Sequence, residues 1–319
     1  MNQTLLVTLL VSGISFGTPL LLAGIGELLA ELSGVLNLGL EGIMLVGAVS
    51  AFWVSQVMSG PIVIVLVVSM ATAGLSGAAL AGLHSILVIR LGASQVVSGL
   101  AITILGGAAG LSSYLGWVGH LTGQAGRHSF SQINVFGLQD LPVIGPIVFH
   151  QDAMVYASWL LVVCVMIYIY RTRWGRELQA VGNQPHAADS CGVNVSAVRY
   201  FHTVAGGVLA GMGGAYFSLG ISTSWSAGMT AGAGWIALGL VIVSFWRPIL
   251  LLLGAYGFGI LTTLGFDLQT RGVHVAPELF AALPYLAAVV VLSLVSNASV
   301  NRNFGAPSAL GIPYRREDQ

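Results

Sequence analysis

The chain has 319 residues, of which 56% are hydrophobic and 7% are charged, and its formal net charge is zero. Soluble domains carry roughly 25% charged residues, and a chain of this length with so few charges cannot cover a water-facing surface. The composition therefore excludes an ordinary soluble fold, and the lack of a basic excess excludes a nucleic-acid-binding surface.

The absence of lysine excludes several kinds of chemistry. All 11 basic residues are arginines, whereas a phosphate-binding P-loop needs a lysine and Schiff-base catalysis needs a lysine amine. The histidines include no pair at helical ligand spacing, and Cys164 and Cys191 lie in an apolar run and a polar loop. We therefore expect no catalytic residues, no metal site and no ATPase activity in this chain, which also disfavours a membrane-embedded enzyme.

Long apolar stretches predict a single transmembrane domain over residues 1–319. About 20 apolar residues cross the hydrocarbon core of a bilayer as a helix. The stretches between polar breaks predict an all-α polytopic bundle of about nine transmembrane helices, within a range of eight to ten. The predicted spans are residues 5–29, 40–58, 61–88, 93–116, 152–170, 199–220, 231–246, 248–267 and 279–296.

Arginine positions predict the orientation of the bundle, because cytoplasmic loops near membrane spans are enriched in basic residues. Arginines cluster just after position 170 and again after position 301, so the loop at 171–197 and the tail at 297–319 are predicted to be cytoplasmic. Counting spans backwards places the loop at 117–151 and the N-terminus outside. Arg127 and Arg271 are exceptions, since both fall on the outer side.

Two short segments indicate an inverted repeat. Gly42–Gly47 reads Gly-Ile-Met-Leu-Val-Gly, and Gly234–Gly239 reads Gly-Trp-Ile-Ala-Leu-Gly. In the predicted topology the two segments enter the membrane from opposite sides. Inverted repeats are typical of transporters, in which two mirrored halves alternate access around a central site.

The predicted cytoplasmic loop contains the pattern of a short helix that lies on the membrane surface. Pro185 suits a first helical turn, Ala187 and Ala188 favour a helix, and Gly192 is placed to end it. The alternative is an ordinary helix that leads from one span to the next.

At this loop the chain resembles the membrane subunits of bacterial ATP-binding cassette (ABC) importers of the branched-chain amino acid, ribose and nucleoside type. The resemblance extends over nearly the whole chain. In that family the loop is the coupling helix, which docks into a cleft of a separate ATPase subunit, so the resemblance implies a permease subunit without its own ATPase site. It assigns the coupling role to Gly175, Glu177, Leu178, Ala180, Val181, Gly182, Pro185, Ala187, Ala188 and Gly192.

A second resemblance concerns the substrate. Residues 33–42 read Ser-Gly-Val-Leu-Asn-Leu-Gly-Leu-Glu-Gly and are similar to a segment of nucleoside-importer permeases, whereas amino-acid permeases of the family usually lack the glutamate. The resemblance implies a nucleoside as the substrate. A simple sugar of the ribose type is the alternative.

Asn37, Glu41, Trp225 and Trp235 are candidates for the substrate pathway. If helical, Asn37 and Glu41 share one face at the inner mouth of the second span, where a carboxylate is costly without a partner or water. Glu41 is therefore expected either to line the aqueous pathway or to hold a loop through backbone N–H groups. A planar base could stack on either tryptophan, although aromatic residues also gather at membrane interfaces.

Glu27 and Glu31 are also four residues apart and lie at the inner end of the first predicted span. We expect them at the membrane interface, with one of them paired to an arginine such as Arg90. Another interpretation joins them with Glu41 as the proton relay of an ion-coupled secondary transporter. Such a transporter would need no partner subunit.

The resemblance to ABC permeases also implies an assembly. This chain would bind no cofactor, while the cytoplasmic ATPase subunit would bind ATP and Mg²⁺. A second, homologous permease subunit would complete the pore, and an extracytoplasmic substrate-binding lipoprotein would dock on the outer loops. The implied location is the bacterial inner membrane, where lipids surround the complex and no nucleic-acid polymer takes part.

Overall fold

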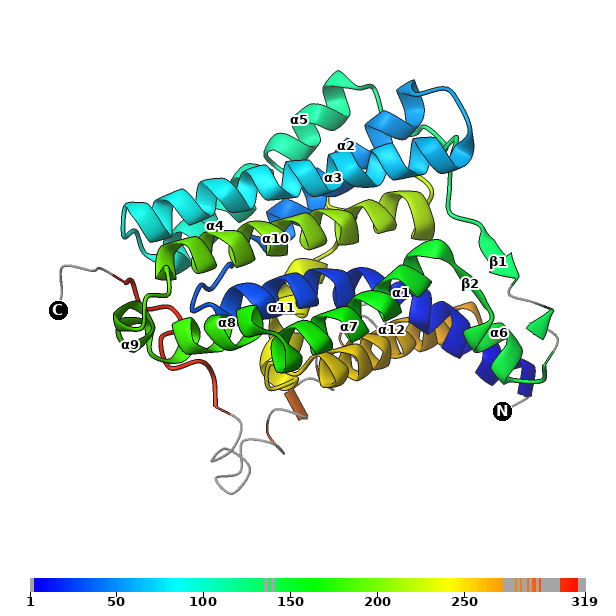
Figure 1. Cartoon of the computed structure of the whole chain (residues 1–319). Coiled ribbons are helices and arrows are strands. Elements are labelled where there is room, and N and C mark those ends of the chain that lie inside the picture. Colours follow the sequence, from blue (N-terminus) through cyan, green and yellow to red (C-terminus); the bar gives the residue numbers. More distant parts are fainter. Residues whose placement is uncertain are drawn as a thin grey trace.

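The computed structural model describes residues 3–134, 137–138, 141–271 and 305–314, together with six single positions between 279 and 293. The regular elements of these residues are helices and one antiparallel pair of strands (Figure 1), as expected for an all-α protein. The elements are α1 (Gln3–Leu32), α2 (Leu40–Val57), α3 (Ile62–Ser85) with the π-helical turn Ile86–Arg90, α4 (Gln95–Gly106), α5 (Leu111–Val118), β1 (Gln132–Asn134), α6 (Ile144–Val148), β2 (His150–Asp152), α7 (Ala153–Arg171), α8 (Arg173–Asn183), α9 (Pro185–Ser190), α10 (Val195–Tyr216) with the π-helical turn Phe217–Ile221, α11 (Ala233–Val243) and α12 (Pro248–Thr270).

Seven helical stretches of the described residues are long and apolar enough to cross a membrane, which confirms a polytopic bundle. The prediction of a span at 231–246 is wrong. Its helix, α11, has 11 residues and is about 16 Å long, so it cannot cross a hydrocarbon core of about 30 Å. The reason is that residues 222–232, which precede α11, are not helical. The predicted span at 279–296 lies outside the continuously described residues.

The bundle is centred on α10, which packs against α1, α2 and α3 (Figure 1). Glycines line these contacts: a Cβ atom on Gly26 of α1 would lie 2.5 Å from the carbonyl oxygen of Gly206, and Gly77 of α3 meets the backbone of Gly207. Helix association in lipid depends on close van der Waals packing, and small residues let two backbones approach. The four helices therefore form one tightly packed unit.

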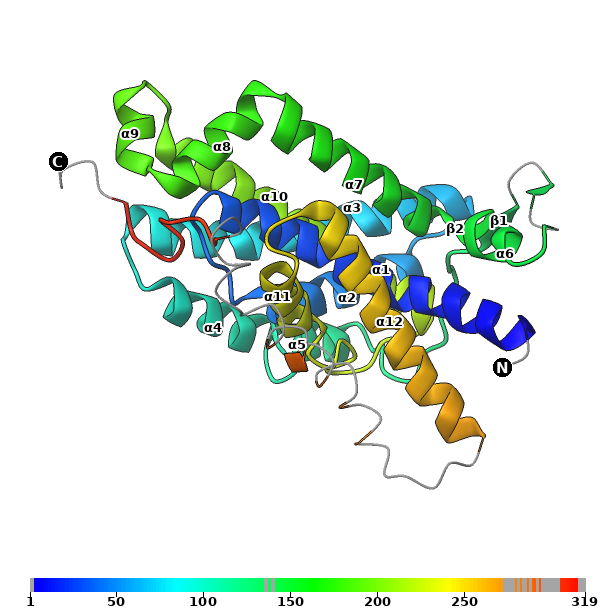
Figure 2. The same ribbon diagram turned by 90° about the horizontal axis from the view of Figure 1, so that it is seen from below.

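The loops of the bundle gather at two opposite ends, as Figure 1 and Figure 2 show. One end carries α8, α9, the start of α10 and the segment 305–314, and we call it the inner end. The other end carries the start of α1 together with α6, β1 and β2, and we call it the outer end. The segments predicted as the outer loop (117–151) and the coupling loop (171–197) thus lie at opposite ends.

The chain after α5 ties the outer ends of α2 and α10 together. The Gly126 amide donates a hydrogen bond to the Thr223 carbonyl at 2.8 Å, just beyond α10. Nη1 of Arg127 donates to the Gln56 carbonyl near the end of α2 at 3.0 Å. Arg127, an exception to the predicted charge asymmetry, therefore has a local structural role.

Residues 222–232 run from the outer end into the middle of the bundle. Near the outer end, the indole of Trp225 fills the space beside Gly116 of α5. Farther along, a Cβ atom on Gly228 would lie 3.5 Å from the Cβ atom of Ala108, which lies in the break between α4 and α5. The chain between α10 and α12 thus consists of an irregular outer half and a helical inner half, α11.

The N-termini of α2 and α11 meet at Glu41. Its Oε1 accepts hydrogen bonds from the Thr230 hydroxyl at 2.6 Å and from the Gly232 amide at 3.0 Å, and its Oε2 accepts one from the Gly234 amide at 2.7 Å. The free amides at a helix N-terminus attract negative charge, so a carboxylate in the first turn of α2 also caps α11. These contacts agree with the expectation that Glu41 holds a loop through backbone N–H groups.

The segments Gly42–Gly47 and Gly234–Gly239 open the two helices that meet at this junction. From there α2 leads to the outer end, whereas α11 leads to the inner end, where the indole nitrogen of Trp246 donates to Glu31 Oε2 at 2.5 Å. The opposite directions of these two helices match the predicted topology. A repeat of two larger halves does not follow from this local relation.

Replacing Glu41→Gln is expected to destabilise the purified protein. Glutamine has nearly the same shape, but it removes the negative charge and turns one acceptor into an amide donor that faces backbone N–H groups. A buried hydrogen-bonding group without a partner costs about 1–3 kcal/mol. The melting temperature in detergent should therefore fall by several degrees.

The matched control is Asp267→Asn, which makes the same chemical change at the outer end of α12. Asp267 pairs with Arg271 at 2.6 Å, and the two side chains are 25% and 53% exposed. Because exposed ion pairs contribute little to stability, this variant should melt near the wild type. If both variants melt with the wild type, Glu41 does not hold the junction.

Candidate functional site

The chain between α7 and α10 forms two helices at the inner end, where the sequence predicted one. α8 and α9 meet in an elbow at Gln184, and the Thr172 hydroxyl caps α8 by accepting a hydrogen bond from the Gly175 amide at 3.1 Å. Pro185 opens α9, and Gly192, with φ of +85°, follows its end. The helix predicted from these two residues is therefore present, and α8 is an addition to it.

One side of the elbow is anchored to the bundle. Leu178 and Val181 are fully buried. The Gly182 carbonyl accepts a hydrogen bond from the Ala309 amide at 2.9 Å, and a Cβ atom on Gly182 would collide with the carbonyl oxygen of Leu32. Since Leu32 is the last residue of α1, a movement of the elbow must displace the inner end of α1.

Of the ten residues predicted for coupling, five are buried and five are exposed or partly exposed. In the second set, the residues that line an open groove at the elbow are Glu177, Ala180 and Ala187. Buried are Gly175, Leu178, Val181, Gly182 and Ala188, exposed are Ala180, Ala187 and Gly192, and Glu177 and Pro185 are partly exposed.

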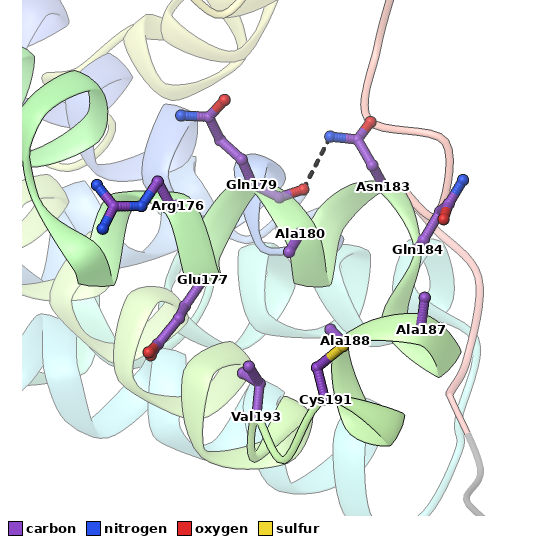
Figure 3. A pocket seen from close by; sticks show the side chains of 10 residues that line it. All are labelled: Arg176, Glu177, Gln179, Ala180, Asn183, Gln184, Ala187, Ala188, Cys191 and Val193. Atoms are coloured by element: carbon purple, nitrogen blue, oxygen red, sulfur yellow. Dashed lines mark hydrogen bonds between the residues drawn. The ribbon is translucent and has the colours of Figure 1, made fainter.

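A groove of about 540 Å³ lies at the elbow (Figure 3). Its lining combines side-chain amides, one arginine and one glutamate with small apolar side chains, and the Asn183 amide donates to the Gln179 carbonyl at 2.8 Å. This mixture of apolar and polar groups is common where one protein receives side chains of another. The groove is lined by Arg176, Glu177, Gln179, Ala180, Asn183, Gln184, Ala187, Ala188, Cys191 and Val193.

Arg199, which the sequence analysis did not single out, connects three segments beneath the elbow. It lies in the first turns of α10 and is 2% exposed. Its Nε donates to the Ser33 carbonyl at 3.1 Å and its Nη1 to the Ile312 carbonyl at 3.1 Å, and the Gly311 amide donates to the Gly34 carbonyl at 3.3 Å. An arginine in an apolar span needs buried partners, and that signal could have identified it.

Asn37 does not form the predicted helical pair with Glu41. It lies in the loop that precedes α2, where its Oδ1 accepts a hydrogen bond from the Gly39 amide at 2.9 Å. The backbone amide of Asn37 donates a hydrogen bond to Glu27 Oε1 at 2.8 Å, and the residue is 1% exposed. The Asn37 side chain therefore shapes the turn into α2 and is buried in the protein.

The two candidate tryptophans have different surroundings. Trp225 is 4% exposed and belongs to an apolar cluster with Phe52 and Tyr216. Trp235 is 39% exposed and follows Gly234, whose amide binds Glu41. The structure therefore brings Trp235 close to the Glu41 junction and buries Trp225 in the outer core.

Glu27 and Glu31 are buried inside the bundle, and the arginine partner expected for one of them is not found among the ion pairs of the described residues. The two residues are 1% and 0% exposed, and they bind the Asn37 amide and the Trp246 indole. The ion pairs of the described residues are Arg173 with Glu177 and Arg271 with Asp267, so Arg90 is not a partner of either carboxylate. The helix α1 carries both residues into the core because it is packed on several sides.

Comparisons with known proteins agree with this architecture. The family model described as branched-chain amino acid transport system / permease component matches residues 9–292. A proposed glucose ABC transporter permease of Haloferax volcanii is 38% identical, over 97% of this chain and 98% of its own length. No solved structure matches the chain.

Two further relatives are permeases named for nucleosides. A nucleoside ABC transporter permease of Lactococcus lactis is 33% identical over 94% of either chain. A guanosine ABC transporter permease of Bacillus subtilis is 29% identical, over 94% of this chain and 93% of its own length. The chain therefore belongs to the family of branched-chain amino acid transport system permease components, in the group of ABC permeases for nucleosides and sugars.

Proposed function

We propose that this ABC permease imports nucleosides and is driven by a separate ATPase that docks in the groove between α8 and α9. The observation that supports docking is the form of the elbow, which is fixed to the bundle on one side and open on the other. A site through which a separate ATPase moves the bundle needs both properties. ATP and Mg²⁺ bind to the partner, since this chain has no lysine for a P-loop.

Backbone contacts at the inner end connect the elbow to the rest of the bundle, so they could transmit a movement of the elbow. Gly182 lies against Leu32, and Arg199 holds the Ser33 carbonyl, so the elbow is connected to the loop between α1 and α2. That loop enters α2, whose first turn holds Glu41 and, through it, the start of α11. A displacement of the elbow by the ATPase would therefore reach the middle of the bundle.

The proposed assembly contains two more proteins. A second, homologous permease subunit packs beside this chain to complete the pore, and an extracytoplasmic substrate-binding lipoprotein delivers the substrate at the outer end. The elbow and the tail face the cytoplasm, and the N-terminus lies outside the cytoplasmic membrane. The opposite directions of α2 and α11 support an inverted repeat as part of this proposal.

The proposed substrate is a nucleoside. Two relatives named for nucleosides and the segment at 33–42 support it, whereas the Haloferax volcanii relative named for glucose supports a sugar. An ion-coupled relay through Glu27, Glu31 and Glu41 has less support, because each of these carboxylates already binds protein donors.

Filling the groove should uncouple the ATPase. Ala187 is exposed and lines the groove, so Ala187→Trp would occupy the space without changing the anchored side of the elbow. Blocking a central pocket of an interface costs about 2 kcal/mol or more, so the ATPase should bind about thirty-fold more weakly. Co-purification and substrate-stimulated ATP hydrolysis in the reconstituted complex measure this loss.

The control for this variant is Ser196→Trp, which adds an indole at an exposed position in the first turn of α10, outside the groove. It should keep both ATPase binding and stimulated hydrolysis. Normal coupling in a correctly folded Ala187→Trp complex would show that the ATPase docks elsewhere.

The orientation can be tested with Cys191, which is exposed in the groove. Cys164 lies within the span Ala153–Arg171, where an apolar environment keeps a thiol unreactive. A membrane-impermeant maleimide should label the chain in inside-out vesicles stripped of peripheral proteins, and Cys191→Ser should abolish the labelling. Labelling of Cys191 in intact cells would place the elbow outside and refute the coupling role.

The substrate can be identified by uptake of labelled uridine, guanosine, ribose and glucose in cells with and without this chain. We expect uridine and guanosine uptake to be lost on deletion and restored by the wild-type gene. Loss of only ribose or glucose uptake would instead identify a sugar permease. Accumulation driven by a proton gradient in proteoliposomes that hold this chain alone would identify a secondary transporter.

A further inference from the structure

We propose that the exposed side of residues 226–231, together with the break between α4 and α5, forms this subunit's wall of the translocation pathway, and that the wall suits an uncharged, hydroxyl-rich solute. This inference rests on the proposed import function and gives it a location. It concerns a segment of the chain that none of the recognised motifs includes.

The wall lies near the middle of the membrane. The apolar stretch Gln95–Val118 has 24 residues, but its helix is interrupted at residues 107–110, between the 12 residues of α4 and the 8 residues of α5. The break therefore lies near the middle of a membrane-spanning stretch. Gly228 lies beside Ala108 in this break, so residues 226–231 reach the same depth.

The backbone of the wall is both irregular and exposed. Within these two stretches the exposed residues are small, and they lie outside helices. Non-helical backbone does not face lipid within the hydrocarbon region, because its N–H and C=O groups would lack partners there. It is found at this depth where it lines a water-filled cavity or is buried in protein. The exposed residues are Ala108, Ala109, Ser226, Ala227 and Ala231.

Other exposed surfaces of the bundle differ from this wall. Leu75 of α3 is 71% exposed, Leu160 of α7 is 66% exposed and Leu253 of α12 is 61% exposed. These large apolar side chains belong to regular helices, whose backbone groups are satisfied within the helix, as lipid requires. At membrane depth the surface therefore consists of two kinds of region. Regular helices with large apolar side chains suit lipid, whereas the irregular backbone of the wall does not.

The segments that form the wall carry no charged side chain. Residues 95–118 and 222–246 contain no aspartate, glutamate or arginine. The nearest carboxylate, Glu41, accepts three hydrogen bonds from residues 230–234. The wall therefore offers hydroxyl and backbone groups to a passing solute but no net charge. A neutral nucleoside or sugar matches such a wall, whereas a zwitterionic amino acid would leave two charges without partners.

Cysteine accessibility tests the wall in the full chain. In a Cys164→Ser, Cys191→Ser background, Ser226→Cys and Ala227→Cys should react with a charged, membrane-impermeant methanethiosulfonate in native membranes. A thiol in water ionises more readily than one in an apolar environment, so the two positions should react at least about ten-fold faster than lipid-facing controls. Modified Ser226→Cys should also lose most of its uridine uptake.

The controls are Ala79→Cys and Leu160→Cys, which place thiols at exposed positions on regular helices of the bundle. Both should remain unmodified and keep transport. If Ser226→Cys reacts as slowly as the controls, the wall faces lipid and the proposal is wrong. If it is unreactive but forms a disulfide with a second subunit on oxidation, the face is a sealed subunit contact, which also overturns the proposal.

The same variants separate this inference from the proposed function. Fast labelling combined with uptake that does not require ATP would contradict the ABC mechanism and leave the wall in place. ATP-dependent uptake without labelling of Ser226→Cys or Ala227→Cys would refute the wall alone. Thermal unfolding of each variant in detergent verifies that the cysteine substitutions leave the bundle folded.

Discussion

The architecture depends on one buried carboxylate that serves two helices. Each helix N-terminus carries the equivalent of about half a positive charge, and Glu41 places one negative charge where the N-termini of α2 and α11 meet. Without it, two positive ends would face each other in a medium of low polarity. α11 begins at this carboxylate, and the residues before it, 222–232, run from the outer end in a non-helical conformation.

At the inner end the segments are joined by a different kind of contact, made directly to backbone atoms. Gly182 and Arg199 fix the elbow and the start of α10 to the end of α1 and the loop after it. Such contacts leave little room for side chains to rearrange and absorb a displacement. The same loop leads into α2, so the helix that carries Glu41 belongs to both the inner anchor and the central junction.

Much of the fold could be predicted from local properties of the sequence. Hydropathy identified the seven long spans, and Pro185 and Gly192 marked the bounds of α9, because these signals act within a few residues. The errors concern residues whose partners are distant in the chain. Glu41 binds residues about 190 positions away, and this contact shortens α11, which hydropathy alone had extended to a full span. Asn37 was misjudged, and Arg199 was not identified, for the same reason, since their roles depend on packing among several segments.

A wall without charge and with small side chains also agrees with the division of work in the proposed assembly. Passage through a membrane protein requires contacts weak enough to release the solute, and a surface of alanine, serine and backbone groups makes few strong ones. In the proposed assembly, specificity then comes from the binding protein at the outer end, and the work comes from the ATPase at the elbow. In this proposal the permease contributes the connection between them, which runs from the groove through α1 and α2 to Glu41 and the start of α11.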